Sequence, residues 1–252
     1  MKIIDSQSCE IEGKSMTFFQ HPLNLFSRIE RTLSEIGAAK FFSDPSEKIK
    51  RVRESMAEYF FAIALKKKFG NDWWVMQPNS EFPDFIIMSV DDGPNKINIE
   101  HFELVEIMNR CQSFEEMMSI VDAKIKKGYP ENYNLLIFIN HEKSKDWIPL
   151  LYKKLEKIHP FKAIWTVHLL YQGEDNPFCS IVNRIRPHPV IHVEANFTDS
   201  FLYELKSLPP FIEMIKDGDN SILTFNKEFI KNFIKKIKID RLKTIKQTRI
   251  RS

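Results

Sequence analysis

The feature that most constrains the fold of this chain is a change of hydrophobic period near residue 70. Before it, the segment "SEKIKRVRESMAEYFFAIALKKKFG" repeats apolar residues at helical spacing and ends in three lysines and a glycine. With a proline at its first turn and Gly70 after its last, this segment predicts a helix over about Pro45 to Phe69. The segments after it have the pattern of β-strands. The switch therefore indicates a long helix packed against a sheet.

Several β-like and helical segments follow this helix in a definite order. Three β-like runs come first, "WWVMQP", "DFIIMSV" and "KINIEHFELVEIM", with the turn-forming "DDGPN" between the last two. Next come a helical segment, "SFEEMMSIVDAKIKKGYP", and a fully apolar run, "YNLLIFIN", typical of a strand buried on both faces. A further helix, "KDWIPLLYKKLEKIHP", precedes strands at "FKAIWTVHLLY", "FCSIVNRIRP" and "VIHVEAN". This order predicts an α/β fold in which a mixed sheet is flanked by helices on both faces.

The chain divides into three predicted parts. Residues 1–44 are expected to form a helical N-terminal lead, residues 45–195 the α/β domain, and residues 196–252 a basic helical C-terminal appendage. From Lys227 onward the chain holds ten Lys and Arg residues against two acids. An apolar stripe from Phe225 to Ile237 predicts an amphipathic helix there, whose lysines form either a solvated face or a contact with a phosphate backbone.

Composition excludes several classes of protein. At 43% hydrophobic and 28% charged residues, the chain resembles ordinary globular proteins. Its 7 glycines form no phosphate-binding loop, and its three cysteines form no CxxC pair. Pro187 and Pro189 flank His188 and disfavour a helix there, so His188 and His192 do not suit a helical HxxxH zinc site. No apolar stretch is long enough to cross a membrane, so we expect a cytoplasmic protein without a membrane partner.

Carboxylates are unusually frequent in the second and third β-like runs. Asp84 follows Pro83 at the start of one run, and Glu100, Glu103 and Glu106 lie in the next. Because side chains alternate along a strand, Glu100 and Glu106 share one face and Glu103 lies on the other, with Asp84 in reach of the start or middle of that strand. Crowded carboxylates raise one another's pKa values unless a cation lies between them. A divalent cation with oxygen ligands, such as Mg²⁺, is the simplest one to propose.

These residues resemble the motif of the PD-(D/E)XK nuclease superfamily. The matching positions are Pro83-Asp84, Glu100 sixteen residues later, and Glu58 in the preceding helix. The superfamily has a restriction-endonuclease-like core of a helix, three antiparallel strands, a helix and a further strand. The resemblance covers roughly residues 47–140, and extends to residue 189 if the later strands are included.

The resemblance implies a metal-dependent endonuclease that hydrolyses phosphodiester bonds in DNA, within a defence system or a mobile element. Asp84 and Glu100 would bind Mg²⁺ or Mn²⁺, with the main-chain carbonyl of His101 as a further ligand and Glu58 reaching in from the first helix. Glu103 and Glu106 are the alternative acids of the motif. The implied partner is nucleic acid, expected to be DNA, and a homodimer is left open.

The chain departs from the motif at its lysine. The position two residues after the acid holds Phe102 if the acid is Glu100, and it is also apolar if the acid is Glu103 or Glu106. In some members the basic group lies on the next helix instead, and Lys124 is our choice for that role. The competing interpretation is a catalytically degenerate member that binds nucleic acid or protein without cleaving.

Each candidate also has a purely structural interpretation. A Pro-Asp pair is a common turn device, glutamates often cover the solvent face of an edge strand, and Glu58 could be an ordinary exposed helical residue. A third interpretation is therefore an unrelated mixed α/β protein with a coincidental Pro-Asp. Metal binding separates the first two interpretations, and the strand order separates both from the third.

Overall fold

The computed structural model describes most of the chain. It describes residues 2–5, 8–11, 14–17, 19–78, 83–90, 97–141, 144–155, 160–170, 179–197, 199, 212–217 and 220–225. These residues fall into two compact units, Met1–Tyr203 and Glu204–Ser252.

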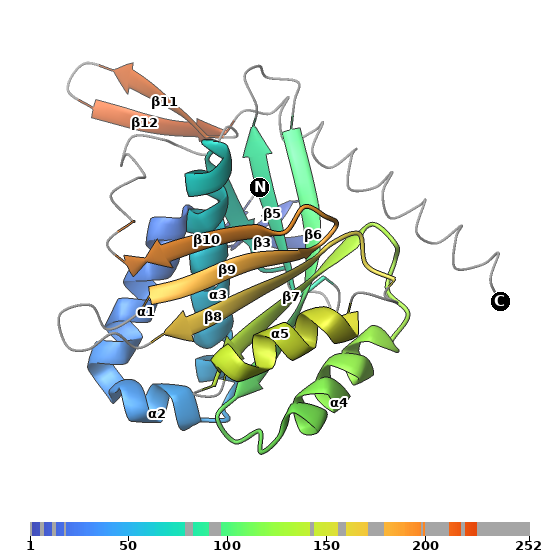
Figure 1. Cartoon of the computed structure of the whole chain (residues 1–252). Coiled ribbons are helices and arrows are strands. Elements are labelled where there is room, and N and C mark those ends of the chain that lie inside the picture. Colours follow the sequence, from blue (N-terminus) through green and yellow to red (C-terminus); the bar gives the residue numbers. More distant parts are fainter. Residues whose placement is uncertain are drawn as a thin grey trace. The chain divides into compact units, whose positions relative to one another are not determined.

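Most secondary structure lies in the first unit (Figure 1). Its helices are α1 (Pro22–Ile36), α2 (Ala38–Ser43), α3 (Glu47–Phe69), α4 (Phe114–Ile125) and α5 (Ser144–Leu155). Its strands are β1 (Lys2–Asp5), β2 (Ser8–Ile11), β3 (Lys14–Thr17), β4 (Trp73–Met76), β5 (Phe85–Val90), β6 (Ile97–Met108), β7 (Tyr133–Asn140), β8 (Ile164–Leu170), β9 (Cys179–Arg186) and β10 (Ile191–Asn196). The second unit contains β11 (Ile212–Asp217) and β12 (Asn220–Phe225), which form an antiparallel pair.

Helix α3 lies at the centre of the first unit. It is buried on every side from Ser55 to Leu65, as expected for a helix that is apolar around its whole circumference. It ends at Gly70, which adopts the left-handed conformation (φ 83°) that favours glycine after a helix.

The sheet has seven strands in the order β10-β9-β8-β7-β6-β5-β4. Strands β4, β5 and β6 are antiparallel neighbours, and β7 pairs parallel to both β6 and β8. The two parallel pairings follow the connections through α4 and α5, because parallel neighbours require a crossover. Along the chain, the order is therefore a helix (α3), three antiparallel strands (β4 to β6), a helix (α4) and a strand (β7).

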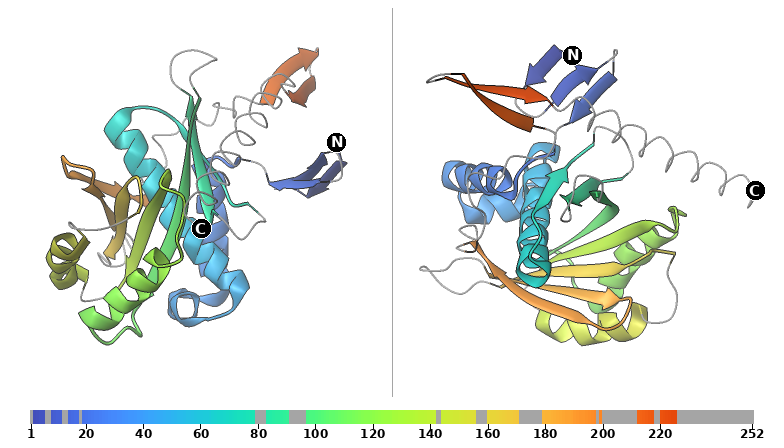
Figure 2. Two further views of the ribbon diagram at one scale, coloured as in Figure 1. Left: turned by 90° about the vertical axis from the view of Figure 1, so that its right-hand side faces the viewer. Right: turned by 90° about the horizontal axis from the view of Figure 1, so that it is seen from above.

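Helices cover both faces of this sheet, and the sheet curls around α3 (Figure 2). On one face α3 packs with α1 and α2 over side chains such as Phe85, Phe102 and Trp165. On the other face α4 and α5 pack over Ile107 and Ile137. The predicted mixed sheet flanked by helices is confirmed, and each face has its own apolar core.

The predicted helical ends of the chain are only partly correct. Helices α1 and α2 occupy the predicted lead, but residues 2–17 form a three-stranded antiparallel sheet, β1-β2-β3. In the predicted helical appendage, residues 212–217 and 220–225 form the antiparallel strands β11 and β12 instead. The basic segment from Lys227 lies outside the described residues.

None of the helices in the described part of the chain has the length and apolar character needed to cross a membrane.

Candidate functional site

The pairing of β5 with β6 decides which glutamate lies near Asp84. Phe85 pairs with Phe102, and Ile87 pairs with Glu100, in an antiparallel register. Extending the register by one residue places Asp84 opposite Glu103. Directly opposed residues of an antiparallel pair point to the same face with neighbouring Cβ atoms, whereas Glu100 points to the other face. The strand geometry thus brings Glu103, and not Glu100, to Asp84.

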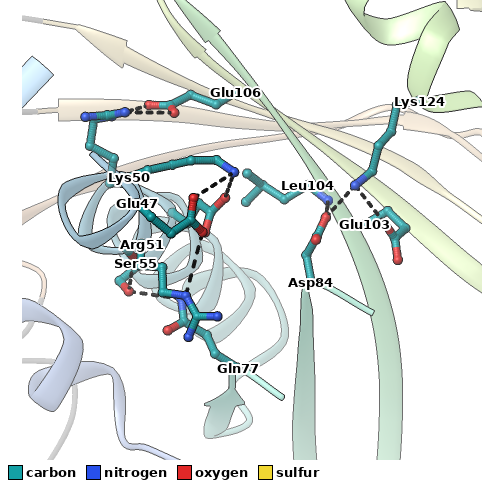
Figure 3. Close-up of polar contacts among 12 residues, drawn as sticks. Glu47, Lys50, Arg51, Ser55, Gln77, Asp84, Glu103, Leu104, Glu106 and Lys124 are labelled. Atoms are coloured by element: carbon teal, nitrogen blue, oxygen red, sulfur yellow. Dashed lines mark hydrogen bonds and ion pairs between the residues drawn. The ribbon is translucent and has the colours of Figure 1, made fainter. Parts of the chain in front are cut away.

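Lys124 completes a three-residue group with these two carboxylates, which we term the carboxylate–lysine triad (Figure 3). Its Nζ lies 2.6 Å from Asp84 Oδ2 and 2.7 Å from Glu103 Oε2. Asp84 Oδ2 also accepts a hydrogen bond of 2.7 Å from the backbone N–H of Leu104. The cation that the crowded carboxylates require is therefore supplied, in this structure, by a lysine of the chain itself.

Helix α4 positions Lys124 in its last turn. The helix begins at Ser113, whose side chain accepts a hydrogen bond from the backbone N–H of Glu116, and its buried Met117 and Val121 pack in the core of that face. Helix α4 packs on β6, and this packing brings Lys124 to the start of β5, next to Asp84. Lys124, the lysine chosen from the sequence, thus lies within ion-pair distance of Asp84.

Burial gives the triad unusual electrostatics. Glu103 is 0% exposed, while the side chains of Lys124 and Asp84 are 15% and 32% exposed, so the triad is accessible to solvent at Asp84. Burial, and next the charge of Asp84, raise the pKa of Glu103 to about 7, against the opposing effect of Lys124. Burial lowers the pKa of Lys124, but Asp84 and Glu103 more than reverse this, and the pKa lies above its ordinary value. Lys124 therefore remains a cation at any physiological pH.

Tyr129 adjoins the triad just beyond α4. The Lys124 ammonium lies 5.5 Å from the centre of its ring. Burial raises the pKa of the Tyr129 hydroxyl to about 12, and both Lys124 and Glu103 interact with it. The tyrosine thus restricts the space into which Lys124 could move.

Glu58 lies in a separate polar group on α3. Its Oε1 accepts a hydrogen bond of 2.9 Å from Gln77 Nε2. The same Nε2 lies 3.1 Å from Ser55 Oγ. Gln77 Oε1 in turn accepts a hydrogen bond of 3.3 Å from Arg28. Glu58 is 1% exposed, and its Oε2 is buried without a hydrogen-bond partner among the described residues. Burial raises its pKa to about 8, with Glu54 and Asp84 acting in the same direction. Asp84 thus influences Glu58 through its charge.

The other predicted ligands have partners elsewhere. Glu100 Oε2 accepts a hydrogen bond of 2.9 Å from Asn134, and its Oε1 contacts Lys162. The main-chain carbonyl of His101 also accepts from Asn134, at 3.2 Å. Glu106 forms a buried ion pair of 2.6 Å with Arg53. The expected approach of Glu100 to Asp84 is not seen, because the register places the two on opposite faces of the sheet.

The donor set of the triad suits a cation that needs few protein ligands. Within the described part of the chain, no three His, Cys, Asp or Glu side chains are grouped closely enough to hold a metal. Mg²⁺ is commonly bound by one or two carboxylates, with water and substrate phosphate completing its octahedron. Asp84 and Glu103 offer two carboxylates, and the Asp84 side chain is 32% exposed, so water and a phosphate can reach it. These two residues therefore fit a hard, oxygen-bound divalent cation.

Sequence reasoning overlooked Gln77 and Tyr129. Gln77 follows β4 directly and Tyr129 follows Gly128 after α4, so both are at element ends that the sequence had identified. Neither residue carries a motif, and only the packing of the elements brings them to Glu58 and Lys124.

Comparisons with protein-family models, with curated proteins and with solved structures gave no match for this chain.

Proposed function

We propose that this chain is a metal-dependent nuclease of the PD-(D/E)XK type, which hydrolyses phosphodiester bonds in DNA. The observation that carries the proposal is the convergence of Asp84, Glu103 and Lys124 from β5, β6 and α4. The order of helix, three antiparallel strands, helix and parallel strand adds support, because it is the order of that superfamily's core. Glu103 takes the place of the motif acid, and Lys124 takes the place of the missing strand lysine.

The residues of the triad would divide the work of hydrolysis. A divalent cation bound by Asp84 and Glu103 would polarise the scissile phosphate and lower the pKa of an attacking water. The backbone N–H of Leu104 holds the Asp84 carboxylate in place. Lys124 presents a permanent positive charge beside both carboxylates, where it can donate hydrogen bonds to an attacking water or to a phosphate oxygen.

Three amide substitutions test the site. Asp84→Asn and Glu103→Gln are expected to lower Mg²⁺-dependent nicking of supercoiled DNA by at least about 100-fold, the scale on which loss of one electrostatic group lowers kcat. Glu100→Gln is the matched control, because Glu100 is on the same strand but on the opposite face. It should nick at nearly the wild-type rate. Thermal melting confirms that each variant is folded.

Two results would contradict this assignment. If Glu100→Gln abolished nicking and Glu103→Gln did not, the acid of the site would be Glu100 in spite of the register. If wild type failed to cleave DNA and RNA with Mg²⁺ or Mn²⁺, the chain would be a degenerate binding module. One observation favours this second candidate function: Lys124 already forms an ion pair with each of the two carboxylates.

A further inference from the structure

We propose that Lys124 is a built-in competitor of the divalent cation, and that it transfers from the carboxylates to a substrate phosphate when metal and DNA bind together. In this proposal Lys124 makes the metal affinity of the free protein low and couples metal binding to substrate binding. It rests on the proposed function, since it assigns the cation to Asp84 and Glu103.

The geometry forces the lysine and the metal into close proximity. Nζ is 2.6 Å from Asp84 Oδ2 and 2.7 Å from Glu103 Oε2. A Mg²⁺ ion lies about 2.0 to 2.1 Å from its ligand oxygens. An ion on either of these oxygens would therefore be no more than about 5 Å from the ammonium. Even at the dielectric constant of water, repulsion between a single and a double charge at about 5 Å weakens binding roughly tenfold.

The lysine has little freedom to avoid this repulsion. Its side chain is 15% exposed, and the ring of Tyr129 lies 5.5 Å from Nζ. Its helix is held by the Ser113 cap and by the packing of Met117 and Val121 on the sheet. If a metal displaced Lys124 from both carboxylates, its ammonium would lose two charge-assisted hydrogen bonds. Because the side chain is mostly buried, water could replace them only in part.

A phosphodiester supplies that new partner. It brings a negative charge and acceptor oxygens to the exposed side of the triad, where Asp84 is 32% exposed. The phosphate can accept hydrogen bonds from Lys124 while its oxygens also complete the coordination of the cation. The two binding events then assist each other, and by linkage each raises the affinity of the other by the same factor.

Lysine-to-methionine substitutions at two positions separate this effect from a general loss of charge. Lys124→Met removes the competing ammonium, whereas Lys127→Met removes an equal charge from an exposed position just beyond the same helix. Mn²⁺ binding is measured by isothermal titration calorimetry and by the electron paramagnetic resonance of free Mn²⁺. Wild type and both variants are titrated in the same buffer, at one pH and one ionic strength. We expect Lys124→Met to bind Mn²⁺ about tenfold more tightly than wild type, and Lys127→Met to match wild type.

A second measurement needs only the folded wild type, in case Lys124→Met does not fold. Dimethyl phosphate, the smallest phosphodiester, should increase the Mn²⁺ affinity of wild type severalfold. The increase should be absent from Lys124→Met if that variant folds. No calculation of absolute affinity is required, because each protein is compared with itself.

The outcomes distinguish this inference from the proposed function. Equal Mn²⁺ affinity in wild type and Lys124→Met, or no effect of dimethyl phosphate on wild type, would overturn the competition while leaving the nuclease assignment intact. If neither protein bound Mn²⁺ and wild type did not nick DNA, both proposals would fall.

Discussion

Removing one partner of the buried ion pair between Arg53 and Glu106 should be among the most destabilising single changes in the first unit. The two side chains are 2% and 8% exposed, and Arg53 Nε donates to Glu106 Oε1 at 2.6 Å. Arg53 Nη1 also donates to the backbone carbonyls of Phe41 and Asp44, at 2.9 and 2.7 Å. One guanidinium therefore connects α3 to β6 and to the C-terminal end of α2.

Arg53→Met would leave a buried carboxylate and a buried carbonyl without their donor. Removing one partner of a buried ion pair typically costs about 3 to 5 kcal/mol. Since ordinary domains have unfolding free energies of about 5 to 15 kcal/mol, we expect the variant to lose about a fifth or more of its stability. Urea denaturation followed by circular dichroism measures this loss. Lys50→Met is the control, because its ion pairs with Glu47 and Glu54 are partly exposed and should contribute under about 1 kcal/mol.

The double variant Arg53→Met, Glu106→Leu tests the physical cause. Replacing both members of a buried pair by apolar residues is often neutral, because no charge is left without a partner. The double variant should therefore recover about 2 kcal/mol or more relative to Arg53→Met alone. A loss of less than about 1 kcal/mol in Arg53→Met, or a double variant less stable than Arg53→Met, would refute the reasoning.

Two predictions concern the pH dependence of stability. Burial raises the pKa of Glu58 from 4.5 to about 8. Between these two pH values the folded state binds more protons than the unfolded state. The free energy of unfolding therefore falls as the pH rises from about 4.5 to about 8. Glu58→Gln should flatten this fall in urea denaturation series at several pH values, and an unchanged slope would show that Glu58 is not its source. Burial lowers the pKa of His168 from 6.5 to about 3, so its contribution is lost as pH falls from about 6.5 towards 3. His168→Gln should shift the acid unfolding midpoint, followed by circular dichroism, to lower pH, and a shift to higher pH would contradict this assignment.

The sequence predicted the central elements because their patterns are strong. The change from helical to β period at Gly70 identified α3 and the three strands after it, and the apolar run at residues 133–140 identified the buried β7. Strands β1 to β3 were overlooked because each has four residues, of which at least half are polar, whereas the equally short β4 is fully apolar.

The candidate site was predicted less completely. Asp84, Glu103 and Lys124 were all named as candidates, but Glu100 was preferred to Glu103, because alternation along a strand does not reveal which residue of the next strand lies opposite. That depends on pairing register, which is set by the connection between β5 and β6 and by which side chains the core accepts. With Glu103 as the acid, the motif's lysine position falls on Val105, which is buried in the apolar core between the sheet and helices α4 and α5.

The hydrogen bond from the Leu104 amide to Asp84 Oδ2 makes the backbone a spectroscopic reporter for the site. An amide proton bonded to a charged carboxylate is sensitive to any change in the charge on that oxygen. In a ¹⁵N-labelled sample, the Leu104 cross-peak should therefore move when Mg²⁺ is added, even before any substrate is present. Binding of a metal ion to Asp84 could thus be followed in solution from a single amide signal, without a chemical probe attached to the site and without any need for turnover.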